Sequence, residues 1–442
     1  MALSFPISVI SSTMVRPEKV NKPGRAKIHL TPHDLELLYV FYPQRGLLFP
    51  KPDPDNHIIP RLKASLVTAL KIYFPLAGRL VKVNNHQDKT LSLYIDCDGS
   101  GAKFVHAKAK SVAVNDVLQS YGSVPDFISQ FFPANDVVSR DALVSEPLLA
   151  IQVTEMKDGV FISFGYNHLV ADGSSFWSFF HTWSKICLNG SVSNIKPLVL
   201  KDWFLDTIDY PVHIPVSEME TQPHCENSTK ERIFHFSVKK ISDLKAKANY
   251  EIGTMFPKIS SLQAVMAYLW LPIISHSGLN REEVTQCKLA ADMRQRLNPS
   301  LKKECFGNVI DVLEALVTVG ELLDHGLGWT ALQISQTVRS KTDESYKTYA
   351  NNWTRDVIIP KLGVRSRLAD HSLIVASSPR FDVYDNDFGW GKPIAARAGP
   401  GNGIGGMLVV FPGVEEGSID VHATLNSSLW SDVLSEPIDQ MI

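Results

Sequence analysis

The segment from residue 148 to residue 187 constrains the fold of this chain more than any other stretch. It opens with two apolar runs, LLAIQV at residues 148–153 and FISFGY at residues 161–166, which are rich in β-forming residues. The polar sequence EMKDG lies between them. Two such runs around a short polar turn predict a β-hairpin whose second strand ends near residue 167.

A histidine stands where this second strand is expected to end. His168 is followed by Asp172 and Gly173, a turn with helix-capping character, and an aromatic-rich amphipathic helix is predicted over residues 174–187. A histidine has a pKa near neutrality, so His168 could serve as a general base in a cleft. The pattern H-x-x-x-D is short, and an ordinary histidine beside a helix-capping aspartate is the alternative.

Composition indicates an ordinary globular protein and argues against several functions. The 442 residues are 44% hydrophobic and 20% charged, with a net charge of −2 and no long basic run, so neither nucleic acid nor a membrane is an expected partner. Five scattered cysteines without C-x-x-C spacing and dispersed histidines predict a reducing compartment and no metal site. The N-terminus is too polar for a signal peptide or a spanning helix, and we therefore expect a cytoplasmic protein.

The length of the chain predicts two domains. Strand and helix patterns alternate over residues 1–187 and predict a first α/β half. Residues 188–232 contain four prolines and few periodic segments, and we predict that they form a crossover linker. Residues 233–442 form the predicted second half, which opens with an alternating strand at residues 233–238. Helices are predicted over residues 59–73, 239–248, 260–274, 320–342 and 344–357.

Two later segments contain residues of possible functional interest. Asp387 begins the sequence DFGWG, in which two glycines surround bulky aromatic side chains; alone it predicts a turn with aromatic core anchors. Lys258, Ser260 and Ser261 stand at the start of the helix predicted over residues 260–274, where backbone N–H groups could bind a phosphate. A plain helix cap is the simpler explanation of these serines.

Taken together, these motifs resemble those of the plant BAHD acyltransferases. The motif from His168 to Asp172 precedes the motif from Asp387 to Gly391 by more than two hundred residues, and the resemblance spans the whole chain. Further landmarks are LTPHDL from Leu30, YFPLAGRL from Tyr73, DMRQR from Asp292 and FGN from Phe306. The resemblance implies an α/β fold of two similarly built domains with mixed central sheets, of the chloramphenicol-acetyltransferase type. A long crossover would join them, and an active-site channel would run between them.

The same resemblance implies an acyltransferase that carries an acyl group from an acyl-CoA thioester to a hydroxyl or an amine of a small plant metabolite. His168 would act as the general base in a ternary complex, without an acyl-enzyme, and no G-x-S-x-G nucleophile motif is present. Asp172 would turn away from the substrate and pair with an arginine, for which Arg294 is the candidate. Acyl-CoA would be a co-substrate, no permanently bound cofactor is expected, and the protein would be a monomer.

Further roles follow from the resemblance. Asp387 is treated as essential in the family and is expected to shape the channel near the coenzyme, with Trp390 and Gly391 in support. Many members carry Ser-Trp about nine residues before this aspartate, and in some the indole helps to hold the oxyanion. Here Ser378 occupies that place, so Thr31 is another candidate donor. A lyase or other non-CoA catalyst of the same fold, and a non-catalytic binding protein, are the alternative functions.

Overall fold

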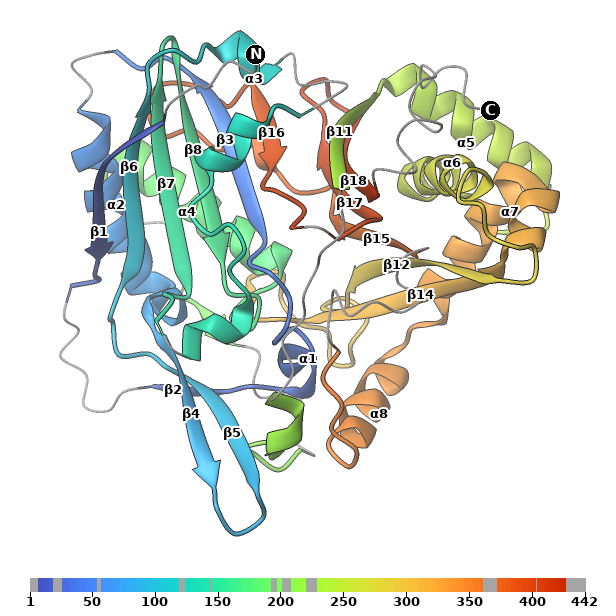
Figure 1. The fold of residues 1–442 in the computed structure, drawn as a ribbon, viewed down its shortest axis with the longest axis horizontal. Helices are drawn as coiled ribbons and strands as arrows, with labels where there is room; N and C mark the ends of the chain where they lie inside the picture. The colour runs from blue at the N-terminus through green and yellow to red at the C-terminus, as the bar shows by residue number, and fades with distance from the viewer. Residues whose placement is uncertain are drawn as a thin grey trace.

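The computed structural model describes residues 7–18, 26–53, 57–118, 124–143, 145–191, 197–200, 208–219, 229–360, 372–402 and 404–426. Two large β-sheets lie beside each other, one built mainly from the first half of the chain and the other from the second half (Figure 1). Helices α2 and α4 accompany the first sheet, and α5, α6 and α7 accompany the second (Figure 1). The molecule is therefore an α/β protein with two sheet-rich halves.

The first sheet has six strands in the order β1-β6-β7-β8-β3-β16. Their bounds are β1 Ser8–Val15, β6 Ala102–Ala109, β7 Leu149–Met156, β8 Gly159–Tyr166, β3 Gln44–Pro50 and β16 Ala395–Ala398. β6 and β7 are parallel and the other neighbours are antiparallel, so the sheet is mixed. The predicted hairpin is formed by β7 and β8. Every residue of β8 is buried, which explains why its sequence is a continuous apolar run.

Helices α2 (Ile58–Ile72) and α4 (Gly173–Asn189) pack against this sheet and against each other. The ring of Phe164 in β8 lies 4.2 Å from that of Phe176 in α4, measured between centroids. Trp183 of α4 donates a hydrogen bond from Nε1 to Ser65 of α2 (3.0 Å). Asp172 caps α4, as the sequence predicts, so aromatic packing holds the helix that follows His168 firmly on the sheet.

The second sheet is also six-stranded and mixed, in the order β11-β18-β17-β15-β12-β14. Its strands are β11 Thr229–Phe236, β18 Ile419–Asn426, β17 Met407–Pro412, β15 Ser372–Ser377, β12 Val284–Asp292 and β14 Ile310–Thr318. The helices α5 (Val238–Ile252), α6 (Ser261–Ser275) and α7 (Val319–Ser340) form a core with one face of it. Residues of the other face, such as Val409 and Phe411, belong to the core of the first half.

One strand connects the two halves directly. β16 follows β15 in sequence, yet it pairs with β3 at the edge of the first sheet, with Ala395 opposite Leu48. The chain thus returns to the first half before it enters β17. The division into residues 1–187, 188–232 and 233–442 stays a prediction, and residues 192–196, 201–207 and 220–228 of the predicted crossover lie outside the described residues.

Smaller elements complete the fold. They are β2 Lys27–His29, β4 Arg79–Asn85, β5 Thr90–Asp96 and β10 Ile214–Pro215 in a small sheet, the pair β9 Val199–Leu200 and β13 Cys305–Phe306, and helices α1 Pro32–Leu35, α3 Val114–Leu118 and α8 Asp343–Trp353. The six predicted helices are confirmed as α2, α4, α5, α6, α7 and α8. In the described part of the chain, no helix has the length and apolar character needed to cross a membrane.

Candidate active site

His168 lies in the turn between β8 and α4, and both halves of the chain hold its backbone. Its N–H donates to the Ser139 hydroxyl (3.2 Å), and its carbonyl accepts from Asn308 Nδ2 (2.7 Å). The preceding residue, Asn167, is fully buried and donates from Nδ2 to the Ser139 carbonyl (2.6 Å). Asn167 Oδ1 also accepts from the Leu169 N–H (2.9 Å), which fixes the turn. The position of the histidine is therefore set by side chains far apart in sequence.

The imidazole of His168 has the properties of a neutral base. Burial lowers its pKa below the ordinary value, although its own backbone and the charge of Asp172 act in the opposite sense. Nδ1 is buried and has no hydrogen-bond partner in the described part of the protein. The ring of Tyr166 lies 5.9 Å from the imidazole, between centroids. At neutral pH the ring is uncharged, so one nitrogen can accept a proton.

Asp172 and Arg294 form a buried, bidentate ion pair. Arg294 Nη1 donates to Asp172 Oδ2 (2.8 Å) and Nη2 donates to Oδ1 (3.1 Å). The carboxylate also accepts from the backbone N–H groups of Ser175 (2.8 Å) and Val309 (2.9 Å). Arg294 donates in addition to the Gly307 carbonyl (3.1 Å). The ion pair that the resemblance implied is thus present, and it joins α4 to the segment before β14.

The charges of this pair are stabilised by each other. Burial alone would raise the pKa of Asp172, but the positive charge and hydrogen bonds of Arg294 hold it below the usual value. Burial would likewise lower the pKa of Arg294, and Asp172 raises it instead. Both groups are therefore charged at neutral pH. The carboxylate oxygens of Asp172 are directed to Arg294 and to the backbone N–H groups of Ser175 and Val309.

A hydrogen-bond chain from α1 reaches the same turn. Asn308 Nδ2, which contacts His168, also donates to Asp34 Oδ1 (2.8 Å). Asp34 Oδ2 accepts from the backbone N–H (2.8 Å) and the hydroxyl (2.7 Å) of Thr31, in the capping box of α1. The hydroxyl proton of the candidate oxyanion donor Thr31 is therefore directed to Asp34 in this structure. Sequence reasoning did not predict this chain, because it links residues 274 positions apart.

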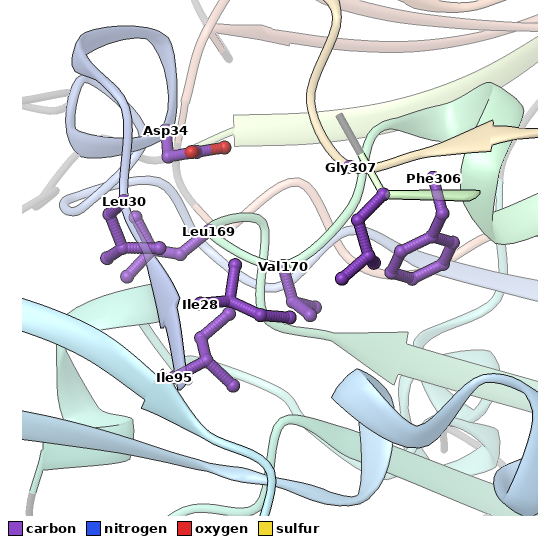
Figure 2. Close-up of a pocket in the computed structure, with 9 residues that line it drawn as sticks. Ile28, Leu30, Asp34, Ile95, Leu169, Val170, Phe306 and Gly307 are labelled. Carbon is purple, nitrogen blue, oxygen red and sulfur yellow. The ribbon is translucent and has the colours of Figure 1, made fainter. Parts of the chain in front are cut away.

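An apolar pocket opens beside this turn (Figure 2). Leu169 and Val170, which directly follow His168, line it together with residues from the small sheet and from the second half. The lining residues are Ile28, Leu30, Asp34, Ile95, Leu169, Val170, Leu200, Phe306 and Gly307. The lining side chains are mostly apolar, and His168 itself is not one of them. The channel that crosses the molecule stays a prediction.

The loop that begins at Asp387 is organised by its own carboxylate. Asp387 Oδ1 accepts from the backbone N–H groups of Gly389 (2.7 Å) and Gly391 (3.1 Å). Both glycines have positive φ angles, 105° and 106°, which favour glycine. Phe388 is fully buried and packs its ring on that of Trp183 (4.8 Å between centroids). The loop therefore docks on α4.

This docking point is far from His168 along α4. Trp183 is ten residues after Gly173, the first residue of the helix, which corresponds to about 15 Å. Trp390 stacks on Phe388 (5.8 Å). The arrangement supports a structural role for Asp387, Trp390 and Gly391 in shaping the molecule around α4.

The start of α6 is a regular capped helix. Ser260 is the N-cap, and its N–H donates to Gln263 Oε1 (2.8 Å) in a capping box. Ser261 is partly buried, and Lys258 is exposed. These residues lie on the second half of the molecule. A role in binding the phosphates of a coenzyme stays a prediction for all three.

The segment at the end of β15 differs from that of many family members. Ser378, at the position of the expected tryptophan, has no indole N–H to offer. Its neighbour Ser377 ends β15 with φ of 70°, and its buried hydroxyl has no partner in the part of the chain that the structure describes. A strained residue with an unused buried hydroxyl is uncommon, and such residues concentrate at functional sites.

Comparisons with known proteins agree with this fold. A family model described as the Transferase family matches residues 5–436. An uncharacterized acetyltransferase of Arabidopsis thaliana is 62% identical over 433 residues, covering 97% of this chain and 98% of that protein. The BAHD acyltransferase DCR of Arabidopsis thaliana is 30% identical over 447 residues, covering 97% of this chain and 91% of that protein.

Solved structures show the same architecture. Vinorine synthase superposes with a TM-score of 0.73 at 21% identity, covering 98% of this chain and 97% of that chain. F. sporotrichioides TRI101 complexed with coenzyme A and T-2 superposes with a TM-score of 0.76 at 18% identity, covering 93% and 97%. The chain belongs to the Transferase family of BAHD acyltransferases, and it is an acyltransferase of the acyl-CoA-dependent type.

Proposed function

We propose that this enzyme transfers an acyl group from an acyl-CoA to a hydroxyl or an amine of a small plant metabolite, with His168 as the general base. The observation that carries the proposal is the imidazole itself, which is neutral, has a buried Nδ1 without a partner and stands beside an apolar pocket lined by both halves. A general base needs this protonation state and a nitrogen that is free to accept a proton.

The reaction would proceed directly between the two bound substrates. His168 removes the proton from the acceptor as its oxygen or nitrogen attacks the thioester carbonyl. When the tetrahedral intermediate collapses, the carbon–sulfur bond breaks and the imidazolium returns the proton to the departing thiolate. Holding both substrates between the two halves supplies much of the acceleration.

Other residues would serve this site without reacting. Asp172 and Arg294 position the turn that carries His168, and the Asp387 loop shapes the surroundings of α4. For Thr31 to stabilise the oxyanion, its hydroxyl has to rotate away from Asp34. Lys258, Ser260 and Ser261 are proposed contacts of the coenzyme phosphates.

Release of free thiol tests the proposal. Wild-type enzyme is assayed with acetyl-, malonyl-, benzoyl-, hydroxycinnamoyl- and long-chain acyl-CoA against hydroxyl and amine acceptors. We expect His168→Gln to lower kcat by about 100- to 10,000-fold, because general base catalysis contributes this much. The exposed His86 provides the matched control, and His86→Gln should retain full activity. Full activity of His168→Gln would refute the base, and absence of thiol release by the wild type would favour a lyase or a binding protein.

We also propose that the enzyme is a monomer and acts in the cytoplasm without a permanently bound cofactor. Light scattering should give the mass of a single 49.1 kDa chain, and a mass of twice this value would contradict the monomer. Imaging of a fluorescent fusion checks the location.

A further inference from the structure

The interface between the two large sheets contains two polar residues, Arg45 and His422, that the proposed mechanism does not use. Arg45 comes from β3 of the first sheet, and His422 comes from β18 of the second. Both lie against the ring of Phe411 in β17, Arg45 Cζ at 5.8 Å from its centroid and the His422 ring at 5.1 Å. Figure 1 shows β3 and β16 on the side of the first sheet that faces the second sheet.

Arg45 has no carboxylate partner among the residues that the structure describes. Within these residues, Arg45 Nη1 donates a hydrogen bond to the carbonyl of Gln44 (2.6 Å). Burial lowers its pKa to about 10, so the guanidinium keeps its charge at neutral pH. The side chain is partly buried, and its guanidinium has five N–H donors that can pair with an anionic group.

His422 presents a second unused donor. Its side chain is 8% exposed, and burial holds its pKa well below the usual value, so the ring is neutral. Nδ1 accepts a hydrogen bond from the Ala398 N–H of β16 (3.1 Å), which places the ring proton on Nε2. Nε2 is buried and has no acceptor within the described ranges. The ring is thus held by the edge of the first sheet with its donor unsatisfied.

This cluster lies next to the proposed base. Arg45 is opposite Phe164 in the register of β3 and β8, and Tyr166 follows on the same face of β8. The ring of Tyr166 in turn lies 5.9 Å from that of His168. Tyr166, which contacts the imidazole, therefore lies on the face of β8 that also carries Phe164, the residue opposite Arg45.

We propose that Arg45 and His422 form a carboxylate-binding subsite, and that the substrate of this enzyme carries a carboxylate near its reacting group. The fork of a guanidinium matches a carboxylate in a bidentate manner, and the Nε2–H of His422 adds a third donor. A neutral analogue would leave both donors unpaired, which gives strong selectivity. This inference rests on the acyl transfer proposed above. The carboxylate belongs either to the acyl group of the donor or to the acceptor.

Matched substrate pairs distinguish these two sources. The first pair is malonyl-CoA and acetyl-CoA with one neutral alcohol as acceptor. The second is 4-hydroxybenzoate and its methyl ester, with acetyl-CoA as donor. We expect the wild type to prefer the charged member of one pair, and Arg45→Gln to reduce the ratio of the two kcat/KM values at least tenfold. Arg339→Gln, at an exposed site on α7, should leave the ratio unchanged.

A binding measurement tests the carboxylate-binding subsite independently of catalysis. The shift in Tm on adding 4-hydroxybenzoate or malonyl-CoA is compared with that on adding the ester or acetyl-CoA. We expect a larger shift with a charged probe for the wild type and loss of this difference in Arg45→Gln. If this pattern appears without any thiol release, the proposed acyl transfer fails and the subsite stands. Equal shifts within each pair, together with equal kcat/KM values, would overturn the subsite.

Discussion

Asp172 stands four residues after His168, but its carboxylate makes four hydrogen bonds to other groups. Two come from Arg294, and the others come from the N–H groups of Ser175 and Val309. At the scale of single residues, the short motif H-x-x-x-D therefore combines the proposed base with a carboxylate that is fully engaged within the protein. Removal of one partner from a buried ion pair leaves an uncompensated charge. The contribution of such a residue is therefore measured best as a change in the free energy of unfolding.

We expect Asp172→Asn to lower the free energy of unfolding by about 3 to 5 kcal/mol, because Arg294 would remain buried without an anion. Asparagine still caps a helix, so the loss would report the ion pair and not the cap. Urea denaturation gives the free energy, and thiol release should fall in parallel. The control is Asp292→Asn, because Asp292 also contacts Arg294 (3.1 Å) but is 42% exposed. Its loss should stay below about 1 kcal/mol. Wild-type stability of Asp172→Asn with a defect in turnover alone would show that the bracing role is wrong.

At the scale of elements, local sequence patterns predicted the helices, the hairpin and the helix caps. The hairpin of β7 and β8, the cap of α4, the periodicity of α2 and the capped apolar run of α6 were all visible in the sequence, because apolar spacing and capping residues act over a few positions. β16 was not predicted. Its four residues, AARA, show no alternation, and the strand exists because β3, about 350 residues earlier, offers an open edge. Contacts at this separation leave no local pattern.

The loop from Asp387 to Gly391 shows how backbone conformation restricts one element. Gly389 has φ of 105°, and a Cβ there would lie 2.6 Å from Arg61 Nη2. We expect Gly389→Ala to lower the free energy of unfolding by about 1 to 3 kcal/mol through backbone strain and this close approach. Gly391→Ala is the matched control, because Gly391 has nearly the same φ (106°) but has open space around a Cβ. Thermal unfolding gives both values, and a loss for Gly391→Ala as large as that for Gly389→Ala would show that backbone strain, and not the Arg61 contact, sets the effect.

At the scale of the whole molecule, the site depends on contacts between the halves. Arg294 meets Asp172, Asn308 meets the carbonyl of His168, and the ring of His33 in α1 stacks on Tyr346 in α8 at 3.9 Å. The Asp172–Arg294 pair could be predicted from the resemblance. The Asn308 bridge and the Arg45 cluster could not, because each depends on contacts between residues far apart in sequence.

The contact of α1 with α8 should also make the stability of the molecule depend on pH. Glu36, at the end of α1, accepts a hydrogen bond from Tyr349 of α8. Burial raises the pKa of Glu36 from 4.5 to about 7, and the charge of Asp311 adds to this effect. The folded state thus binds the proton more tightly than the unfolded state. Stability is therefore lost as pH rises from about 4.5 to about 7, and the loss stays constant at higher pH.

Replacement of Glu36 by glutamine should remove this loss, because the amide keeps an oxygen for the Tyr349 hydroxyl but does not ionise. Relative to wild type, we expect Glu36→Gln to be more stable at pH 8 by up to about 3 kcal/mol and nearly unchanged at pH 4.5. Urea denaturation at both pH values measures the difference, with Glu416→Gln at an exposed site as the control. The pH dependence of other carboxyl groups cancels in this comparison, because it is common to both proteins. The same gain at both pH values would mean that packing, and not ionisation of Glu36, sets the effect. A gain confined to pH 8 would show that a single proton at the contact between α1 and α8 alters the stability of the whole molecule.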